Sequence, residues 1–289
     1  MLENERLRNA FSVDVEDFYQ VSAFEKDIPF ANWEKYPQRV VESTKRLLDL
    51  LEENSVSATF FILGWVAIHH PTLVREIANR GHEIGFHSMT HSLIYRMSPN
   101  DFRNELIEGK KVLEDIAGVR VEAFRAPSFS ITKNSLWALE ILVEEGFRYD
   151  SSVFPIYHDR YGISDAPKDI HEIPTPAGSL FEFPPSVVSI GRINLPVSGG
   201  GYFRLYPYSF SRFCLRRINK VEKRPFVFYV HPWEIDWEQP KLPFGSRATQ
   251  FRHRVGLKGN LDKLQKLLRD FSFSKLSEVI NYEIEKGAL

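Results

Sequence analysis

Two histidines, His87 and His91, stand four residues apart in the segment Gly85-Phe-His-Ser-Met-Thr-His, directly after an apolar run. On one helical turn, side chains at this spacing share a face, so two imidazoles can converge on one divalent cation. A metalloprotease motif has the same spacing, but Ser88 and Met89 occupy the inner positions here, which disfavours a protease. The alternative is a pair of surface histidines without a role.

Three carboxylates, Asp14, Glu16 and Asp17, crowd into four residues after another β-branched run. Such groups repel one another unless a cation or another partner neutralises them. Two imidazoles, one carboxylate and open positions for water would suit zinc or a similar first-row metal, and a further acid could serve as base. A solvated acidic loop is the alternative interpretation.

Apolar runs of strand length alternate with helical patterns along the chain. From residue 11 to about 155 this alternation predicts parallel βα units, and the number of units favours a barrel, an α/β fold. Active residues of such barrels collect at the carboxyl ends of strands. The expected strands cover about 9–15, 58–64, 83–87, 123–127, 147–150 and 225–230, and the expected helices about 36–54, 71–80, 98–117, 132–145, 209–220 and 261–271.

The chain changes character over residues 157–207, which are rich in Pro, Gly and short β-like runs. This segment is expected to form irregular strands and loops inserted over one face, and a C-terminal extension follows about residue 235. No repeat, low-complexity tract or flexible linker is evident. A single domain over residues 1–289 is therefore predicted.

The overall composition excludes several classes of protein. The net charge of −1 gives no support for nucleic-acid binding, and the single cysteine excludes an internal disulfide. No apolar stretch reaches the roughly 18 residues of a membrane span. The charged N-terminus lacks an apolar run of signal-peptide length, so a cytoplasmic location is expected. The 23 Phe, 11 Tyr and 5 Trp favour an aromatic core, although some could stack on sugars.

Five short motifs, taken in order, resemble the active-site motifs of the polysaccharide deacetylase family, also called the NodB-homology family or carbohydrate esterase family 4. More narrowly, Val13-Asp-Val-Glu-Asp-Phe and His231-Pro-Trp-Glu-Ile-Asp resemble a bacterial subgroup from exopolysaccharide loci. The five motifs are the residue 14–17 acids, His87-Ser-Met-Thr-His91, Phe124-Arg-Ala-Pro127, Tyr149-Asp-Ser-Ser152 and Val230-His231-Pro232.

The resemblance implies a distorted (β/α) barrel of seven or so parallel strands and a site for Zn²⁺ or another divalent ion. His87 and His91 would be ligands, and Asp14 the general base. The family has adjacent aspartates where Val15 follows Asp14 here, so the ligating carboxylate is Glu16 or Asp17. Strand alternation favours Glu16, whereas a turn could present Asp17.

Further roles follow from the same resemblance. His231 would be the general acid that protonates the leaving amine. Arg125 would pair with Asp14, and Asp150 would orient His231, although either could be a structural ion pair. The candidate substrate-binding residues are Pro127, Ser128 and Phe129, with Trp233 and Tyr202 as a sugar-stacking wall.

The expected activity is metal-dependent hydrolysis of N-acetyl groups from an amino-sugar polysaccharide, oligosaccharide or precursor, with release of acetate. Hydrolysis of a small amide, as in allantoinase-like relatives, and a non-catalytic carbohydrate-binding barrel are the alternatives. The residues predict no oligomeric state.

Overall fold

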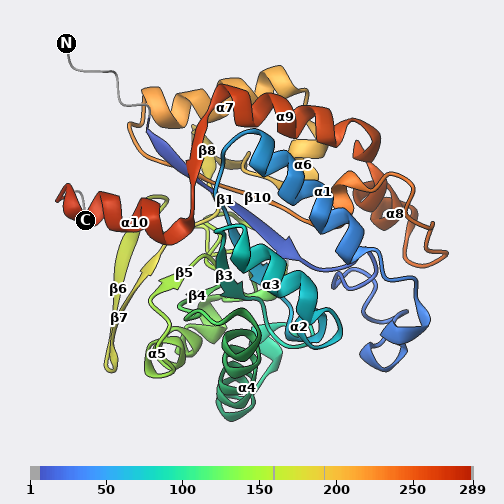
Figure 1. Ribbon diagram of the computed structural model, residues 1–289. Helices are drawn as coiled ribbons and strands as arrows, with labels where there is room; N and C mark the ends of the chain where they lie inside the picture. Colours follow the sequence, from blue (N-terminus) through green and yellow to red (C-terminus); the bar gives the residue numbers. More distant parts are fainter. Residues whose placement is uncertain (1–6, 159, 192, 288–289) are drawn as a thin grey trace.

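The computed structural model describes residues 7–158, 160–191 and 193–287. Its main sheet has the order β10-β1-β2-β3-β4-β5-β7-β6, and neighbours from β10 to β7 are parallel (Figure 1). Only β6 pairs antiparallel, in a hairpin with β7. The strands are β1 (Arg8–Val15), β2 (Thr59–Ile62), β3 (Glu83–Phe86), β4 (Ala123–Phe124), β5 (Tyr149–Asp150), β6 (His171–Thr175), β7 (Gly178–Glu182) and β10 (Val227–Val230).

The distortion of the barrel lies between β7 and β10, where single residues of the intervening chain, and not a paired strand, contact β10. The amide of Val227 donates to the Ser186 hydroxyl, and the amide of Tyr229 donates to the Ser198 carbonyl. Gly199 forms an isolated bridge to Tyr229 with a φ of 144°, and a Cβ there would lie 2.0 Å from the Tyr229 carbonyl oxygen. Only glycine fits this close approach. The predicted α/β fold with a distorted barrel is confirmed.

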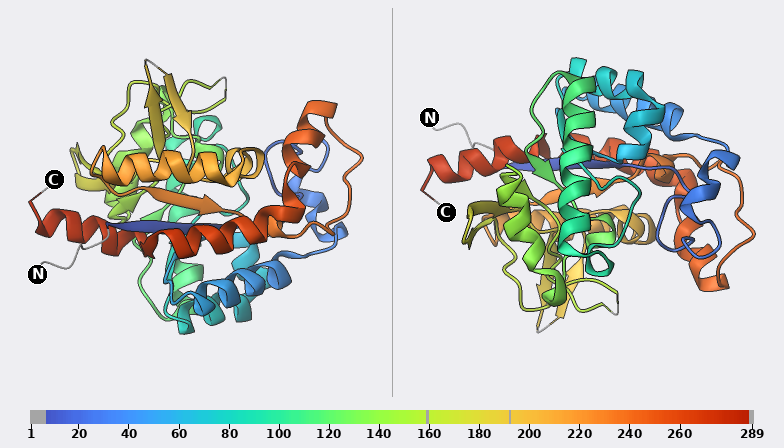
Figure 2. Two further views of the ribbon diagram at one scale, coloured as in Figure 1. Left: turned by 90° about the horizontal axis from the view of Figure 1, so that it is seen from above. Right: turned by 90° about the horizontal axis from the view of Figure 1, so that it is seen from below.

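Helices lie around much of the outside of the sheet, whereas the β6–β7 hairpin extends at its edge (Figures 1 and 2). α4 shows how the sequence sets its ends: the Ser98 hydroxyl accepts a hydrogen bond from the Asp101 amide, and Gly118 is left-handed at the C-cap. The helices are α1 (Val40–Glu53), α2 (Gly64–His69), α3 (Pro71–Asn79), α4 (Pro99–Ala117), α5 (Trp137–Glu144), α6 (Gly200–Leu205), α7 (Tyr208–Lys220), α8 (Arg247–Arg254), α9 (Asn260–Asp270) and α10 (Leu276–Glu285).

The sequence predicted irregular strands and loops in residues 157–207 but no helix there, and it predicted no strand in the C-terminal extension. The segment 157–207 contains the β6–β7 hairpin, a separate antiparallel pair of β8 (Val187–Ile190) and β9 (Ile193–Pro196), and α6. In the C-terminal extension, β11 (Ser272–Ser274) pairs with the start of β1. Strands from both halves of the chain thus join one sheet, and the single domain stays a prediction.

The core is rich in phenylalanine, as the composition predicted. Its fully buried side chains include Phe11, Phe60, Phe86, Phe102 and Phe124. Among the described residues, no helix is both long and apolar enough to cross a bilayer.

A buried histidine makes the fold sensitive to acid. The Nδ1 atom of His82 accepts a hydrogen bond from the Ala58 amide, and burial, with the nearby charges of Lys275 and Arg80, lowers the pKa of His82 to about 4. Because the unfolded state protonates first, stability should fall as the pH drops from about 6.5 to 4, by at most about 3 kcal/mol.

We expect His82→Asn to reduce this pH dependence, since the amide oxygen of Asn can still accept from Ala58. Urea unfolding of both proteins at pH 7 and pH 4.5 measures the difference. An equal loss of stability in both proteins would exclude His82 as its source.

Candidate active site

A cavity of about 750 Å³ opens at the carboxyl ends of the strands. The carboxyl end of β1 points toward α8, and the segment that follows β1 lies beside that helix (Figure 1). Phe24 of this segment contacts His253 of α8, with 5.1 Å between the ring centroids. The cavity is therefore built by both halves of the chain. Its polar and aromatic lining includes Asp14, Glu16, His87, His91, Ser128, Phe129, Arg160, Tyr161, Tyr202, Arg204, His231, Trp233, Glu234, Phe251, Arg252 and His253.

Glu16, His87 and His91 form a buried group whose potential ligand atoms all lie within 4.8 Å of one another. Glu16 follows β1, and both histidines follow β3, so two strands that flank β2 supply the three donors from the same end of the sheet. The Nε2 atom of His91 lies 2.9 Å from Oε2 of Glu16. The imidazole of His87 donates through Nδ1 to the Arg125 carbonyl at 2.7 Å, which leaves Nε2 for a ligand.

The charges of these groups also fit a cation. Burial acts to raise the pKa of Glu16, but His91, His231 and His87 outweigh it and lower the pKa to about 2. Burial lowers the pKa of His87 to about 4, so its imidazole is neutral at pH 7. An ionised carboxylate and a neutral imidazole are the forms that ligate zinc.

Asp17 points away from this group. One carboxylate oxygen accepts from the Phe18 amide, and the other accepts from the amides of Arg39 at 2.6 Å and Val40 at 3.0 Å. Both latter amides lie at the start of α1, so Asp17 satisfies donors at the N-terminus of that helix. The geometry thus brings Glu16, and not Asp17, to the two histidines.

Asp14 lies at the carboxyl end of β1 and is paired with Arg125. The Arg125 guanidinium is fully buried and donates to Oδ1 of Asp14 at 2.7 Å, to the Ser12 hydroxyl and to the carbonyl and hydroxyl of Ser151. Oδ2 of Asp14 lies 3.8 Å from Nε2 of His231. The predicted pairing is present, and it orients the Asp14 carboxylate.

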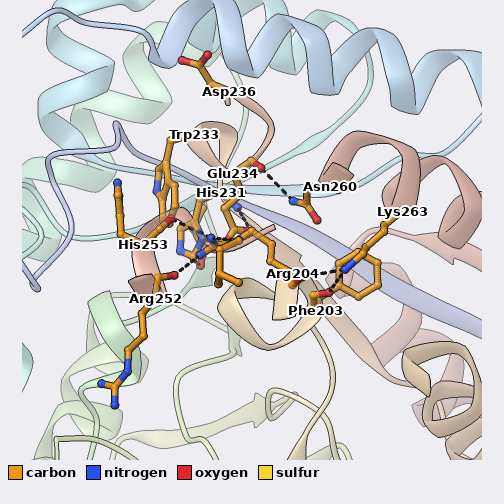
Figure 3. Close-up of polar contacts among 12 residues, drawn as sticks. Phe203, Arg204, His231, Trp233, Glu234, Asp236, Arg252, His253, Asn260 and Lys263 are labelled. Atoms are coloured by element: carbon orange, nitrogen blue, oxygen red, sulfur yellow. Dashed lines mark hydrogen bonds and ion pairs between the residues drawn. The ribbon is translucent and has the colours of Figure 1, made fainter. Parts of the chain in front are cut away.

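The partner of His231 differs from the prediction. Nδ1 of His231 lies 3.5 Å from Oε1 of Glu234, and Nε2 lies 3.6 Å from Oε1 of Glu16. The Arg204 guanidinium donates to the same Oε1 of Glu234 at 3.1 Å (Figure 3). Burial acts to lower the pKa of His231, but Glu234, Glu16 and Asp14 raise it to about 9. The imidazole is therefore charged at pH 7.

Asp150 does not orient His231, which corrects the prediction. It lies at the end of β5 beside β7, fully buried, and its partners are the Ser152 hydroxyl and Glu182. Burial and the neighbouring Asp150 raise the pKa of Glu182 well above its usual range. The two carboxyls form a buried acid pair outside the cavity lining.

The predicted substrate-binding residues are only partly in the cavity. Ser128, Phe129 and Tyr202 line it, whereas Pro127 is buried behind it. Ser128 and Phe129 have left-handed φ values of 52° and 53°, which is strained backbone for non-glycine residues. The turn after Pro127 thus has a fixed, unusual shape next to the reacting groups.

Trp233 lines the cavity but is 6% exposed and packed on both faces, so it offers no open wall to a sugar. Its ring stacks between His231 at 5.3 Å and His253 at 4.5 Å, and its Nε1 donates to Glu16 at 3.2 Å. This side chain positions a proposed ligand and a proposed acid.

Glu234 and Arg204 were not recognised from the sequence. Glu234 follows His231 by three residues, and the 3-10 turn at Pro232–Ile235 brings the two side chains together. That spacing was a usable signal. Arg204 precedes Glu234 by 30 residues on α6, and only the tertiary structure brings it to Glu234.

We expect Glu234→Gln to lower kcat about tenfold or more at constant KM, because His231 loses the anion that orients it and holds its charge. Asp236→Asn is a matched control: Asp236 lies just after the same turn (Figure 3), is equally buried and pairs with Arg39 instead. Steady-state kinetics of both variants, with thermal unfolding alongside, measure the effect. Equal losses of kcat in the two variants would contradict a specific role of Glu234.

Two family models match the chain. Residues 27–147 match the polysaccharide deacetylase family, and residues 151–281 match a domain of unknown function, DUF3473. A peptidoglycan-N-acetylglucosamine deacetylase of Bacillus cereus is 38% identical over 101 residues, which are 35% of this chain and 37% of that protein. A chitooligosaccharide deacetylase of a Bradyrhizobium species is 33% identical over 70 residues, 24% of this chain and 32% of that protein. The chain thus spans about a third of the length of these curated relatives.

The fold is also that of solved deacetylase structures. A crystal structure from Mycobacterium smegmatis, described as a polysaccharide deacetylase, has a TM-score of 0.65 and 21% identity over 99% of this chain and 93% of that chain. The match of residues 27–147 to the polysaccharide deacetylase family confirms the resemblance of the motifs in that region. The region matching DUF3473 supplies His231, Glu234 and Arg204, and it contributes more than half of the residues that line the cavity.

Proposed function

We propose that this protein is a metal-dependent N-deacetylase that hydrolyses N-acetyl groups of an amino-sugar polymer or its precursor and releases acetate. One observation carries the proposal: a cavity places the Glu16, His87 and His91 donors beside a carboxylate, Asp14, and an imidazole, His231. This is the set of groups that metal-assisted amide hydrolysis requires.

The donors fit Zn²⁺ or another divalent ion. Two imidazoles and one carboxylate are a typical set of ligands for catalytic zinc. In addition, Nδ1 of His91 is buried and has no hydrogen-bond partner among the described residues. A bound ion would lower the pKa of its water and polarise the amide carbonyl.

The protein side chains would move the protons. Asp14, held by Arg125 through Oδ1, accepts a proton from the attacking water at Oδ2. Water oxygen bonds to the carbonyl carbon, and the carbon–nitrogen bond then breaks. His231 donates its proton to the departing nitrogen, because an amine leaves poorly as an anion. The products are acetate and the free amino sugar.

The turn after Pro127 offers a backbone amide that could donate a hydrogen bond to the oxyanion that develops on the amide carbonyl. The amides of Phe129 and Ser130 donate within the turn, to the carbonyls of Ala126 and Pro127. We assign the remaining amide, that of Ser128, to the oxyanion, since Ser128 lines the cavity.

The names of the relatives support an N-acetyl amino-sugar substrate. The Val13-Asp-Val-Glu-Asp-Phe motif further supports the exopolysaccharide subgroup. A lipid-linked precursor would reconcile such a substrate with the predicted cytoplasmic location.

The test is acetate release from N-acetylglucosamine oligomers, measured with purified protein before and after chelation and again after zinc is returned. We expect release that chelation abolishes and zinc restores. Turnover of allantoin instead would favour the small-amide hydrolase, and binding of the oligomers without turnover would favour the carbohydrate-binding barrel.

A further inference from the structure

Apart from Arg204, which is buried and paired with Glu234, the described charged residues that line the cavity are segregated by sign. Among the described residues of the lining, the acids are Asp14, Glu16 and Glu234, all buried and each next to a cationic or imidazole partner. Arg160 and Arg252 line the same cavity but are exposed. The outer wall is therefore positive.

Neither of these two guanidiniums forms an ion pair within the part of the chain that the structure describes. By contrast, Arg125 and Arg204, deeper in the site, are both paired with acids. Both outer charges act on the Tyr161 phenol and oppose the rise in its pKa that burial causes. Arg160, Arg252 and Tyr161 all line the same cavity, so both guanidiniums face one enclosed space.

The backbone of Arg252 is fixed relative to the reacting groups. The Arg204 guanidinium donates to the carbonyl of Arg252 at 3.2 Å and to that of His253 at 2.9 Å, while its Nε binds Glu234 (Figure 3). The Arg252 side chain extends away from this network (Figure 3). The Arg204 guanidinium therefore binds both Glu234, the partner of the proposed general acid, and the backbone of Arg252.

Phe251, the neighbour of Arg252 on α8, is 59% exposed and also lines the cavity. An exposed aromatic ring beside a guanidinium suits a sugar that carries an anion, since the ring can cover a sugar face while the arginine binds the acid.

We propose that Arg160 and Arg252 form an anion subsite, so that the substrate is an acidic glycan: an N-acetyl amino sugar next to a carboxylate- or phosphate-bearing group. This inference rests on the proposed deacetylation. The two arginines would repel a polymer that carries only protonated amines. An acidic group next to the N-acetyl amino sugar would bind the arginines and would also neutralise the amine that deacetylation produces.

The experiment compares three probes of different charge: a neutral N-acetylglucosamine pentamer, a hyaluronan oligosaccharide, which alternates N-acetylglucosamine with glucuronate, and uridine diphosphate N-acetylglucosamine. Acetate release is measured for each with the zinc-loaded protein, Arg252→Gln and Arg160→Gln. Calorimetric binding of the same probes is measured in parallel, independently of turnover. Arg247→Gln is the control, because Arg247 is an exposed arginine on the same helix outside the cavity lining.

We expect the wild-type protein to bind an acidic probe more tightly than the neutral pentamer. In each cavity variant this preference should be about five- to tenfold smaller, and the difference from the wild type should be larger at low salt than at high salt. The control should keep it. The carboxylate and phosphate probes distinguish the two sources of the anion.

Equal binding of neutral and acidic probes, or equal effects of all three variants, overturns the anion subsite even if acetate is released. Arginine-dependent binding of an acidic probe without acetate release would instead support the subsite and contradict the deacetylase activity.

Discussion

Glu16→Gln should lower the zinc affinity of the protein by roughly 100-fold or more and reduce acetate release in parallel. The amide keeps the size of the side chain and an oxygen for the Trp233 indole, so the loss reflects the missing ligand charge. The carboxylate lies within 4.8 Å of the donor atoms of both histidines. Zinc competition against a chromophoric chelator measures the affinity.

Asp17→Asn is the matched control, since the sequence left Glu16 and Asp17 as alternatives. Its carboxylate accepts amides at the start of α1, so this variant should lose about 1 kcal/mol of stability but retain zinc. Thermal unfolding of the metal-free proteins separates the two effects. Loss of zinc in Asp17→Asn, with retention in Glu16→Gln, would reverse the assignment of the ligand.

The choice between the two acids illustrates what local rules can and cannot predict. Alternation along β1 put Glu16 on the side of Asp14, and both do line the cavity. Asp17 instead accepts hydrogen bonds from the start of α1, which lies 22 residues later in the sequence and contacts Asp17 only in the folded chain. Strand alternation was therefore sufficient to place Glu16, which directly follows β1.

Asp150 shows the limit of strand-end reasoning. Its place at the end of β5 was predicted, but its neighbour was not, because the sheet order brings β7 and Glu182 beside it. β7 lies in the segment that the sequence predicted only as irregular. The acid that does contact His231 comes from a 3-10 turn three residues away, and its arginine comes from α6.

The strands of the barrel were more predictable than the way in which the barrel closes. Apolar runs such as Thr59–Ile62 are buried on both faces, and their hydrophobicity is read directly from the sequence. The closing segment instead depends on single hydrogen bonds, such as that from Val227 to Ser186, and on Gly199. Such contacts leave no periodic pattern.

Asp14→Asn should lower kcat on the order of 10³-fold while zinc binding and the fold are retained. Asn can still accept from Arg125 through its amide oxygen, but it cannot accept a proton from water. The fully buried guanidinium then lacks a compensating charge, so stability should fall as well, by about 3 kcal/mol. Single-turnover acetate release, zinc titration and urea unfolding measure the three effects.

Asp150→Asn provides the comparison, because Asp150 is an equally buried strand-end acid that lies outside the cavity lining. It should retain kcat within a few-fold, since its carboxyl contacts Ser152 and Glu182 and no reacting group. A fall of kcat on the same scale in both variants would mean that damage to the barrel ends, and not loss of a base, explains the effect of Asp14→Asn. A difference of two orders of magnitude or more would assign the proton transfer to Asp14, since both variants replace a buried carboxylate by the same amide.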